Sequence, residues 1–124
     1  MIALPRSVRV YAYPKAADLR RGYNGLFALV QQGLGRDPLS GDLYLFTNAK
    51  RTGCKVLLWD GTGLCIYMKR LERGRFAALW REGESAALRL TASELALYIE
   101  GCTLVGKTRL SPHEIEPRAV AAST

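Results

Sequence analysis

Cysteine and histidine, the side chains that most often ligate zinc or act as nucleophiles, are few in this sequence. The cysteines are Cys54, Cys65 and Cys102, no two of them form a CxxC pair, and the single histidine is His113. A structural zinc site needs about four Cys or His ligands at short spacings, so the composition excludes one. Cys54 and Cys65 lie in apolar runs and Cys102 follows a predicted helix end, which favours buried thiols. We expect no metal and no cofactor.

Carboxylates are the second class of side chain that could do chemistry, because nucleases and DNA strand transferases cluster them around two metal ions. Those in the first 90 residues are Asp18, Asp37, Asp42, Asp60, Glu72, Glu82 and Glu84. Their spacing gives no reason for them to converge, and the four aspartates suit helix caps or turns. The chain also lacks the nucleophile motif GxSxG and the phosphate-binding motif GxxxxGK[ST]. We therefore expect no catalytic residue, and a small nuclease is the weakest alternative.

Positive charge is the strongest chemical signal, and it is uneven along the chain. The 124 residues hold 18 Lys and Arg against 11 Asp and Glu, a net charge of +7. Residues 1–75 hold 13 basic and 5 acidic side chains, whereas residues 76–124 are close to neutral. Arginine, the more frequent base here, suits bidentate contacts with phosphate. The balance favours a polyanionic partner, nucleic acid ahead of a membrane surface.

Three short basic runs carry this charge. They are candidate nucleic-acid contacts, made up of Arg20, Arg21, Lys50, Arg51, Lys69, Arg70, Arg73 and Arg75. Each run alone is typical of a solvated surface, but three in one half of a small chain point to phosphate binding. None lies on a recognisable base-reading helix, so the expected contacts are with the DNA backbone.

Hydrophobic periodicity predicts the elements that position these runs. Strands are expected at 7–13, 43–46, 54–59 and 64–69, and helices at 18–34 and 92–100. Strand 7–13 alternates as a half-buried strand does. Asp18 is the expected N-cap of the first helix, and Gly33 and Gly35 flank its end. Thr91 and Glu94 form a capping box before the second helix, which Gly101 closes; Leu90 and Leu95 form a hydrophobic staple.

The hairpin between the third and fourth strands has a predicted register. Pairing Asp60 with Leu64 leaves a three-residue loop, and it places Val56 and Leu58 beside Ile66 and Met68. The other face then carries Lys55, Leu57, Trp59, Cys65, Tyr67 and Lys69. That face is either a platform for nucleic acid or a surface covered by a helix, and its large apolar side chains favour the cover.

These elements predict an α+β fold, a single small domain with a mainly antiparallel sheet of about four strands and two helices. The domain is expected over residues 1–105, with 106–124 as a flexible tail. No stretch approaches the roughly 18–20 apolar residues of a membrane span, so no membrane partner is expected. The N-terminus MIALPRSVRV does not resemble a secretory signal, which makes the cytoplasm the expected compartment.

Four segments together resemble a known family. They are DLRRGYNGL at 18–26, RDPLSGDLYLF at 36–46, KVLLWDGTGLCIYMKRLERGRF at 55–76 and LTASELALYIEG at 90–101. The chain resembles, over residues 3–104, the accessory TnpB protein encoded by the second reading frame of insertion-sequence family sixty-six. The most specific part is the W-D-G-x-G-L…K-R-L-E-x-G-x-F block at 59–76.

The resemblance implies a helper protein in transposition of a bacterial mobile element, in which a separate, larger protein is the transposase. The family supplies no catalytic residues to carry over. We expect a non-catalytic accessory protein that binds DNA, the transposase, or both through its basic surface. The alternative is a protein–protein adaptor without DNA contact, which predicts an exposed apolar patch such as Leu57, Trp59 and Tyr67.

Overall fold

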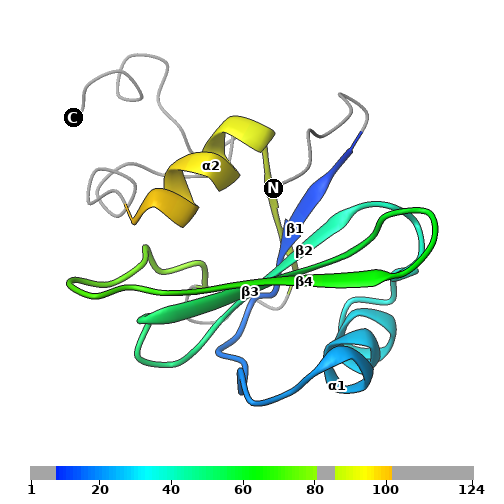
Figure 1. Ribbon diagram of the computed structural model, residues 1–124, viewed down its shortest axis with the longest axis horizontal. Helices are drawn as coiled ribbons and strands as arrows, with labels where there is room; N and C mark the ends of the chain where they lie inside the picture. Colours follow the sequence, from blue (N-terminus) through cyan, green and yellow to red (C-terminus); the bar gives the residue numbers. More distant parts are fainter. Residues whose placement is uncertain (1–7, 81–85, 102–124) are drawn as a thin grey trace.

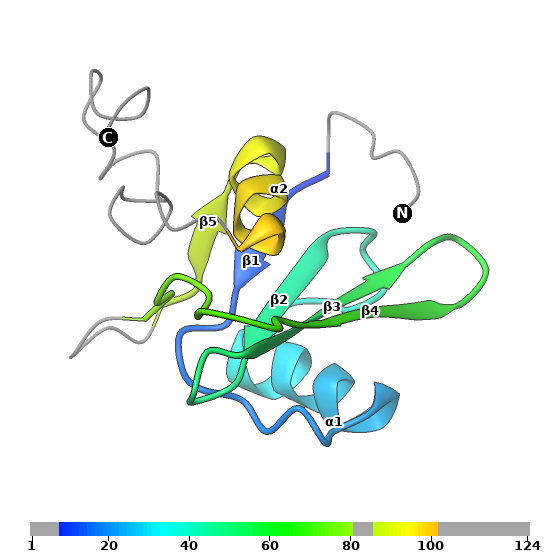
Figure 2. The same ribbon diagram turned by 60° about the vertical axis from the view of Figure 1, so that its left-hand side comes forward.

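The computed structural model describes residues 8–80 and 86–101, which form one five-stranded sheet with a helical segment on each face (Figures 1 and 2). The elements in chain order are β1 (Val10–Ala12), α1 (Tyr23–Ala28), η1 (Leu29–Gly33), β2 (Leu43–Thr47), β3 (Gly53–Trp59), β4 (Leu64–Arg70), β5 (Leu88–Leu90) and α2 (Ala92–Glu100). The sheet order is β4-β3-β2-β1-β5, and only β1 and β2 run parallel. The predicted α+β class and mainly antiparallel sheet are confirmed, with five strands rather than about four.

Strand β1 is central rather than half-buried, which corrects the expectation for 7–13. Val10 and Ala12 pack on the α2 side of the sheet, and Tyr11 packs on the α1 side. All three are buried, because β1 lies between β2 and β5 and each face has its own cover. The predicted alternation is present, but both faces are covered, so Tyr11 is buried as well.

The first helix begins later than predicted. Its N-cap is Gly22, and Asp18 instead accepts hydrogen bonds from the backbone N–H of Arg20 (2.9 Å) and from the Arg20 guanidinium. The α-helix continues as the π-helical turn η1, and Gly35, at a φ of +64°, follows its end as expected. The prediction of Asp18 as the N-cap is therefore wrong. The carboxylate of Asp18, which lies four residues before the actual N-cap Gly22, binds Arg20.

The predicted hairpin register is wrong by one residue. Trp59, not Asp60, lies opposite Leu64, and Val56 lies opposite Tyr67. The side chains of β4 are consequently on the opposite faces from those predicted. The α1 face carries Lys55, Leu57, Trp59, Leu64, Ile66 and Met68, and the α2 face carries Val56, Leu58, Cys65, Tyr67 and Lys69.

The loop chemistry of Asp60 explains this register. Its Oδ1 accepts hydrogen bonds from the N–H groups of Thr62 (2.9 Å) and Gly63 (2.9 Å), and its own N–H donates to the Gly63 carbonyl (3.1 Å). The loop therefore closes at Asp60 and Gly63, one residue earlier on the β4 side than predicted. Burial does not oppose the slip, because β4 is an edge strand with both faces partly exposed.

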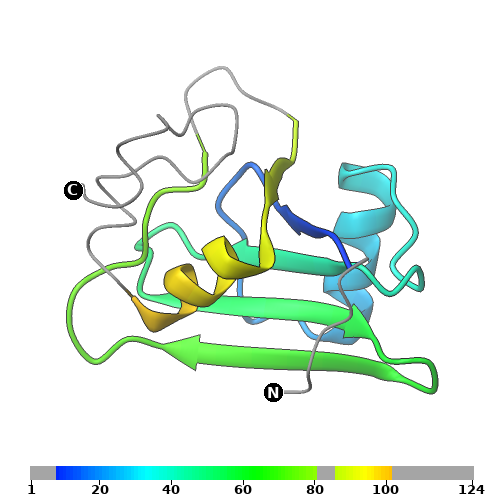
Figure 3. The ribbon, with the colours of Figure 1, turned by 90° about the horizontal axis from the view of Figure 1, so that it is seen from above.

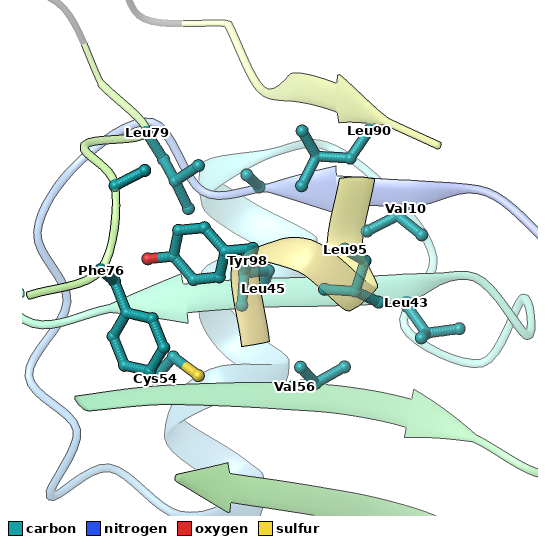
Figure 4. Packing of buried hydrophobic residues seen from close by; sticks show 12 residues of the cluster. Val10, Leu43, Leu45, Cys54, Val56, Phe76, Leu79, Leu90, Leu95 and Tyr98 are labelled. Atoms are coloured by element: carbon teal, nitrogen blue, oxygen red, sulfur yellow. The ribbon is translucent and has the colours of Figure 1, made fainter. Parts of the chain in front are cut away.

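The second helix matches its prediction. Thr91 Oγ1 accepts from the Glu94 N–H (3.0 Å), Glu94 Oε1 accepts from the Thr91 N–H (2.8 Å), and Gly101 closes the helix in the left-handed conformation. Leu90 and Leu95 are both buried in the cluster beneath α2, as the staple requires (Figure 4).

The core on this side joins α2 to the sheet. Tyr98 stacks on Phe76 at 4.9 Å between ring centroids, and its hydroxyl hydrogen-bonds Thr47 of β2. Strand β5 was not predicted; it pairs antiparallel with β1, opposing Leu90 to Val10. Three residues are too few for a periodic signal, so this pairing exists only through tertiary contact.

Several expectations fall outside the described residues: those for Glu82, Glu84, Cys102, His113 and the tail 106–124. Within residues 8–80 and 86–101, no helix has the length and apolarity needed to cross a membrane.

Candidate nucleic-acid interface

The fold brings the second and third basic runs to one end of the sheet, where β2 and β4 finish and β3 begins (Figure 3). The segment after β4 lies along the β2–β3 loop: the Leu71 N–H donates to the Thr52 carbonyl (2.8 Å), and the Phe76 N–H donates to the Arg51 carbonyl (2.7 Å). We call the eight predicted side chains at this place the basic end: Arg20, Arg21, Lys50, Arg51, Lys69, Arg70, Arg73 and Arg75.

Two hydrogen bonds bring the first run, before α1, to the same end. The Ala17 N–H donates to the carbonyl of Thr47, the last residue of β2, at 2.9 Å. Lys55 Nζ, from the start of β3, donates to the Arg21 carbonyl at 2.8 Å. Segments that are 30 to 50 positions apart in the sequence therefore meet.

Arg51 holds the loop and the strand exit together. It has a φ of +60°, a left-handed conformation that is uncommon outside glycine. Asn48 Oδ1 accepts from the N–H groups of Thr52 (2.9 Å) and Gly53 (3.1 Å), which tightens the turn around it. The Arg51 guanidinium donates to the Phe76 carbonyl at 3.3 Å, so this side chain is a structural clamp as well as a charge.

Lys69 is also engaged within the fold. Its Nζ donates to the carbonyl of Ile99 at 2.9 Å, in the last turn of α2, where a helix end favours a cation. Cys54 lies opposite it in β3, and burial raises the pKa of the Cys54 thiol to about 11. That thiol stays protonated near neutral pH. Cys54 is buried as expected, whereas Cys65, on the edge strand β4, is only partly buried.

Arg20 is paired but open to solvent. Its guanidinium donates to both carboxylate oxygens of Asp18, with Nη2 2.9 Å from Oδ2. This hydrogen bonding lowers the pKa of Asp18 to about 2. The Arg20 side chain is 92% exposed, so the pair is screened by water and leaves donors free for another anion.

The other five cations of the basic end are exposed, and their side chains make no hydrogen bond or ion pair within the described part of the chain: Arg21, Lys50, Arg70, Arg73 and Arg75. In the three segments that hold the basic end, 15–21, 48–53 and 69–75, the acids are Asp18 and Glu72. The arrangement offers several separate cations around one end of the sheet, which suits the spaced phosphates of a nucleic-acid backbone.

Asp37 and Asp60 take the turn roles predicted for them, whereas Asp18 caps no helix and Asp42 accepts from a segment distant in sequence. Asp37 Oδ1 accepts from the Leu39 N–H (2.9 Å), and Asp42 Oδ1 accepts from the Arg9 N–H (3.2 Å). Hydrogen bonds from Thr62 and Gly63 lower the pKa of Asp60 to about 2. Over residues 8–80 and 86–101, no group of three or more His, Cys, Asp and Glu side chains could hold a metal ion.

The apolar patch expected for an adaptor is not formed as predicted. Leu57 is fully buried beneath α1, and Tyr67 lies on the opposite face because of the corrected register. Sequence reasoning also missed a second cluster, in which the guanidinium carbons of Arg36 and Arg89 lie 4.0 and 5.4 Å from the centroid of the Tyr11 ring. This cluster depends on the unpredicted pairing of β1 with β5, so no local sequence pattern could predict it.

Comparison with known proteins gives a family match. The family model described as IS66 Orf2 like protein matches residues 8–109. Two proteins of Sinorhizobium fredii (strain NBRC 101917 / NGR234), "Uncharacterized protein y4hO" and "Uncharacterized protein y4jC", are each 34% identical over 101 residues. Those residues cover 82% of this chain and 86% and 85% of the two relatives. No solved structure shows significant similarity.

Proposed function

The chain belongs to the IS66 Orf2-like protein family, which accompanies insertion sequences, and on this premise we propose that it is a non-catalytic accessory factor that binds DNA through the basic end. The observation that carries the proposal is the meeting of three separate basic runs at one end of the sheet. Folding against charge repulsion is unfavourable, and a surface that gathers cations in this way is suited to an anionic partner.

The expected mode of binding is contact with phosphates. Arg21, Lys50, Arg70, Arg73 and Arg75 project from loops and strand ends rather than from one helix. Such contacts release counterions, so affinity falls steeply with salt and varies little with base sequence. Arg51 and Lys69 contribute charge while they hold the surface in shape.

Two double variants with the same number of lost arginines test the location of the contact. Arg73→Ala/Arg75→Ala removes two exposed cations of the basic end. Arg9→Ala/Arg89→Ala removes two exposed cations elsewhere, one just before β1 and one in β5. We expect the first pair to weaken binding to a random-sequence duplex about tenfold or more, and the second to change it little. Equal losses in fluorescence anisotropy titrations would show that only net charge matters.

The transposase of the element is the second partner that we propose, because the family accompanies insertion sequences. Acidic protein surfaces and DNA would compete for the same cations. Adding the transposase to the titration distinguishes the two roles. An adaptor binds the transposase and does not bind DNA, whereas a DNA-binding factor binds DNA in its absence.

A further inference from the structure

Strand β4 forms one edge of the sheet, and no described element lies beyond it (Figure 3). It is seven residues long, whereas β5 at the other edge has three. An edge strand presents a row of unpaired N–H and C=O groups that another strand can pair with. Two of its side chains are large, apolar and exposed: Met68 at 55% and Tyr67 at 36%.

The pairing with β3 shows which backbone groups face outward. The hydrogen bonds Asp60 N–H to Gly63 O and Leu71 N–H to Thr52 O place residues 63 and 71 toward β3. The direction of the backbone N–H and C=O groups alternates along a strand, and the register is unbroken. The backbone groups of the odd-numbered residues between 63 and 71 therefore also point toward β3. The outward groups therefore belong to Leu64, Ile66, Met68 and Arg70.

We propose that a second copy of this chain pairs with β4, antiparallel, about a two-fold axis at Tyr67. In this register Leu64 pairs with Arg70 of the second copy, and Ile66 pairs with its Met68. All four outward residues of each copy are then hydrogen-bonded within the strands. An axis at Ile66 or at Met68 would instead align one outward residue of each copy with a loop.

The side chains are self-complementary in this register. Tyr67 lies directly opposite its own copy, and aromatic cross-strand pairs are favourable at that short separation. On the α1 face, exposed Met68 meets Ile66 of the second copy. The two exposed apolar side chains of the edge are therefore both covered.

Charge selects the antiparallel direction and a second copy as occupant. Lys69 and Arg70 lie at one end of β4, and antiparallel pairing places them opposite Cys65 and Leu64 of the second copy. A parallel, in-register pair would set each cation beside its own copy, which is unfavourable. The strand thus matches itself in length, apolar pattern and charge.

The mass of the full chain in solution, measured by light scattering over a concentration series, tests the proposal. We expect twice the chain mass of 13.7 kDa. Tyr67→Lys places two ammonium groups next to each other at the axis. This variant should be folded by circular dichroism and monomeric by light scattering, whereas Tyr67→Phe should stay dimeric. A wild-type chain that is monomeric at every concentration, or a Tyr67→Lys variant that remains dimeric, would overturn it.

Cross-linking tests the register and does not depend on how Tyr67→Lys folds. In a chain with Cys65→Ser and Cys102→Ser, Tyr67→Cys should form an intermolecular disulfide on mild oxidation, because residues opposite at the axis lie about 4.5 Å apart between Cα atoms. Met68→Cys in the same chain should not, since it opposes Ile66. The reverse pattern would refute the axis at Tyr67. This inference does not depend on DNA binding.

Discussion

Single residues at the basic end divide into those that shape the surface and those that are free to contact a partner. Arg51 and Lys69 donate to the main-chain carbonyls of Phe76 and Ile99. From the sequence alone, all eight residues are simply members of basic runs, and nothing distinguishes them. Only the hydrogen bonds, which join residues 25 and 30 positions apart, separate the two roles.

Arg51 allows a prediction at this scale, because its φ of +60° and its guanidinium bond act in opposite directions on stability. Arg51→Ala keeps the strained conformation and loses the bond, so we expect the free energy of unfolding to fall by about 1 kcal/mol. Arg51→Gly loses the same bond but removes the strain, and should be about 1 kcal/mol more stable than the alanine variant. Urea unfolding measures both, and a glycine variant no more stable than the alanine variant would contradict this account.

Among the elements, α2 holds the side of the sheet opposite α1, and its first turn includes a carboxylate in an unfavourable place. Glu94 is only 7% exposed, and its Oε2 is buried without a partner in the described part of the chain. This burial raises the pKa of Glu94, although hydrogen bonds from Thr91 oppose the shift. The charged form therefore lowers the stability of the folded chain near neutral pH.

The sign of the pH dependence follows. Because the folded chain has the higher pKa, it binds the proton more readily than the unfolded chain, and stability contributed at Glu94 decreases as pH rises through that raised pKa. Glu94→Gln keeps an acceptor for the Thr91 N–H, so we expect it to be more stable than wild type at neutral pH. Thermal unfolding should show the difference shrinking as pH falls toward about 4.3, the usual pKa of glutamate. A difference that does not change with pH would count against it.

Local signals decided which elements the sequence could predict. The capping box of α2 and its closing glycine lie within eleven residues and were predicted correctly. The hairpin strands were also found, but not their register, because β4 is partly exposed on both faces and Asp60 forms a tighter loop with Gly63. Strand β5 and the buried second face of β1 depend on each other, so neither has a signal in its own segment.

For the whole molecule, the sequence located the charge before residue 76 but not its position in space. The predicted cations do gather, because Thr47, Arg51 and Thr52 accept backbone hydrogen bonds from segments on either side of them in sequence. The face of the sheet on which Lys69 and Arg70 each lie followed only from the corrected register. Five cations without partners in the described residues remain as the proposed contact surface.

The salt dependence of DNA binding tests the central claim most directly. Each phosphate contact by a cation lowers the slope of log affinity against log salt by about 0.9, so five contacts predict a slope of about −4.5 on duplex DNA. Replacing Arg21, Lys50, Arg70, Arg73 and Arg75 with alanine, in a variant shown to be folded by circular dichroism, should remove most of that slope and the affinity with it. A folded variant with wild-type affinity and slope would contradict the assignment of the basic end as the DNA-binding surface.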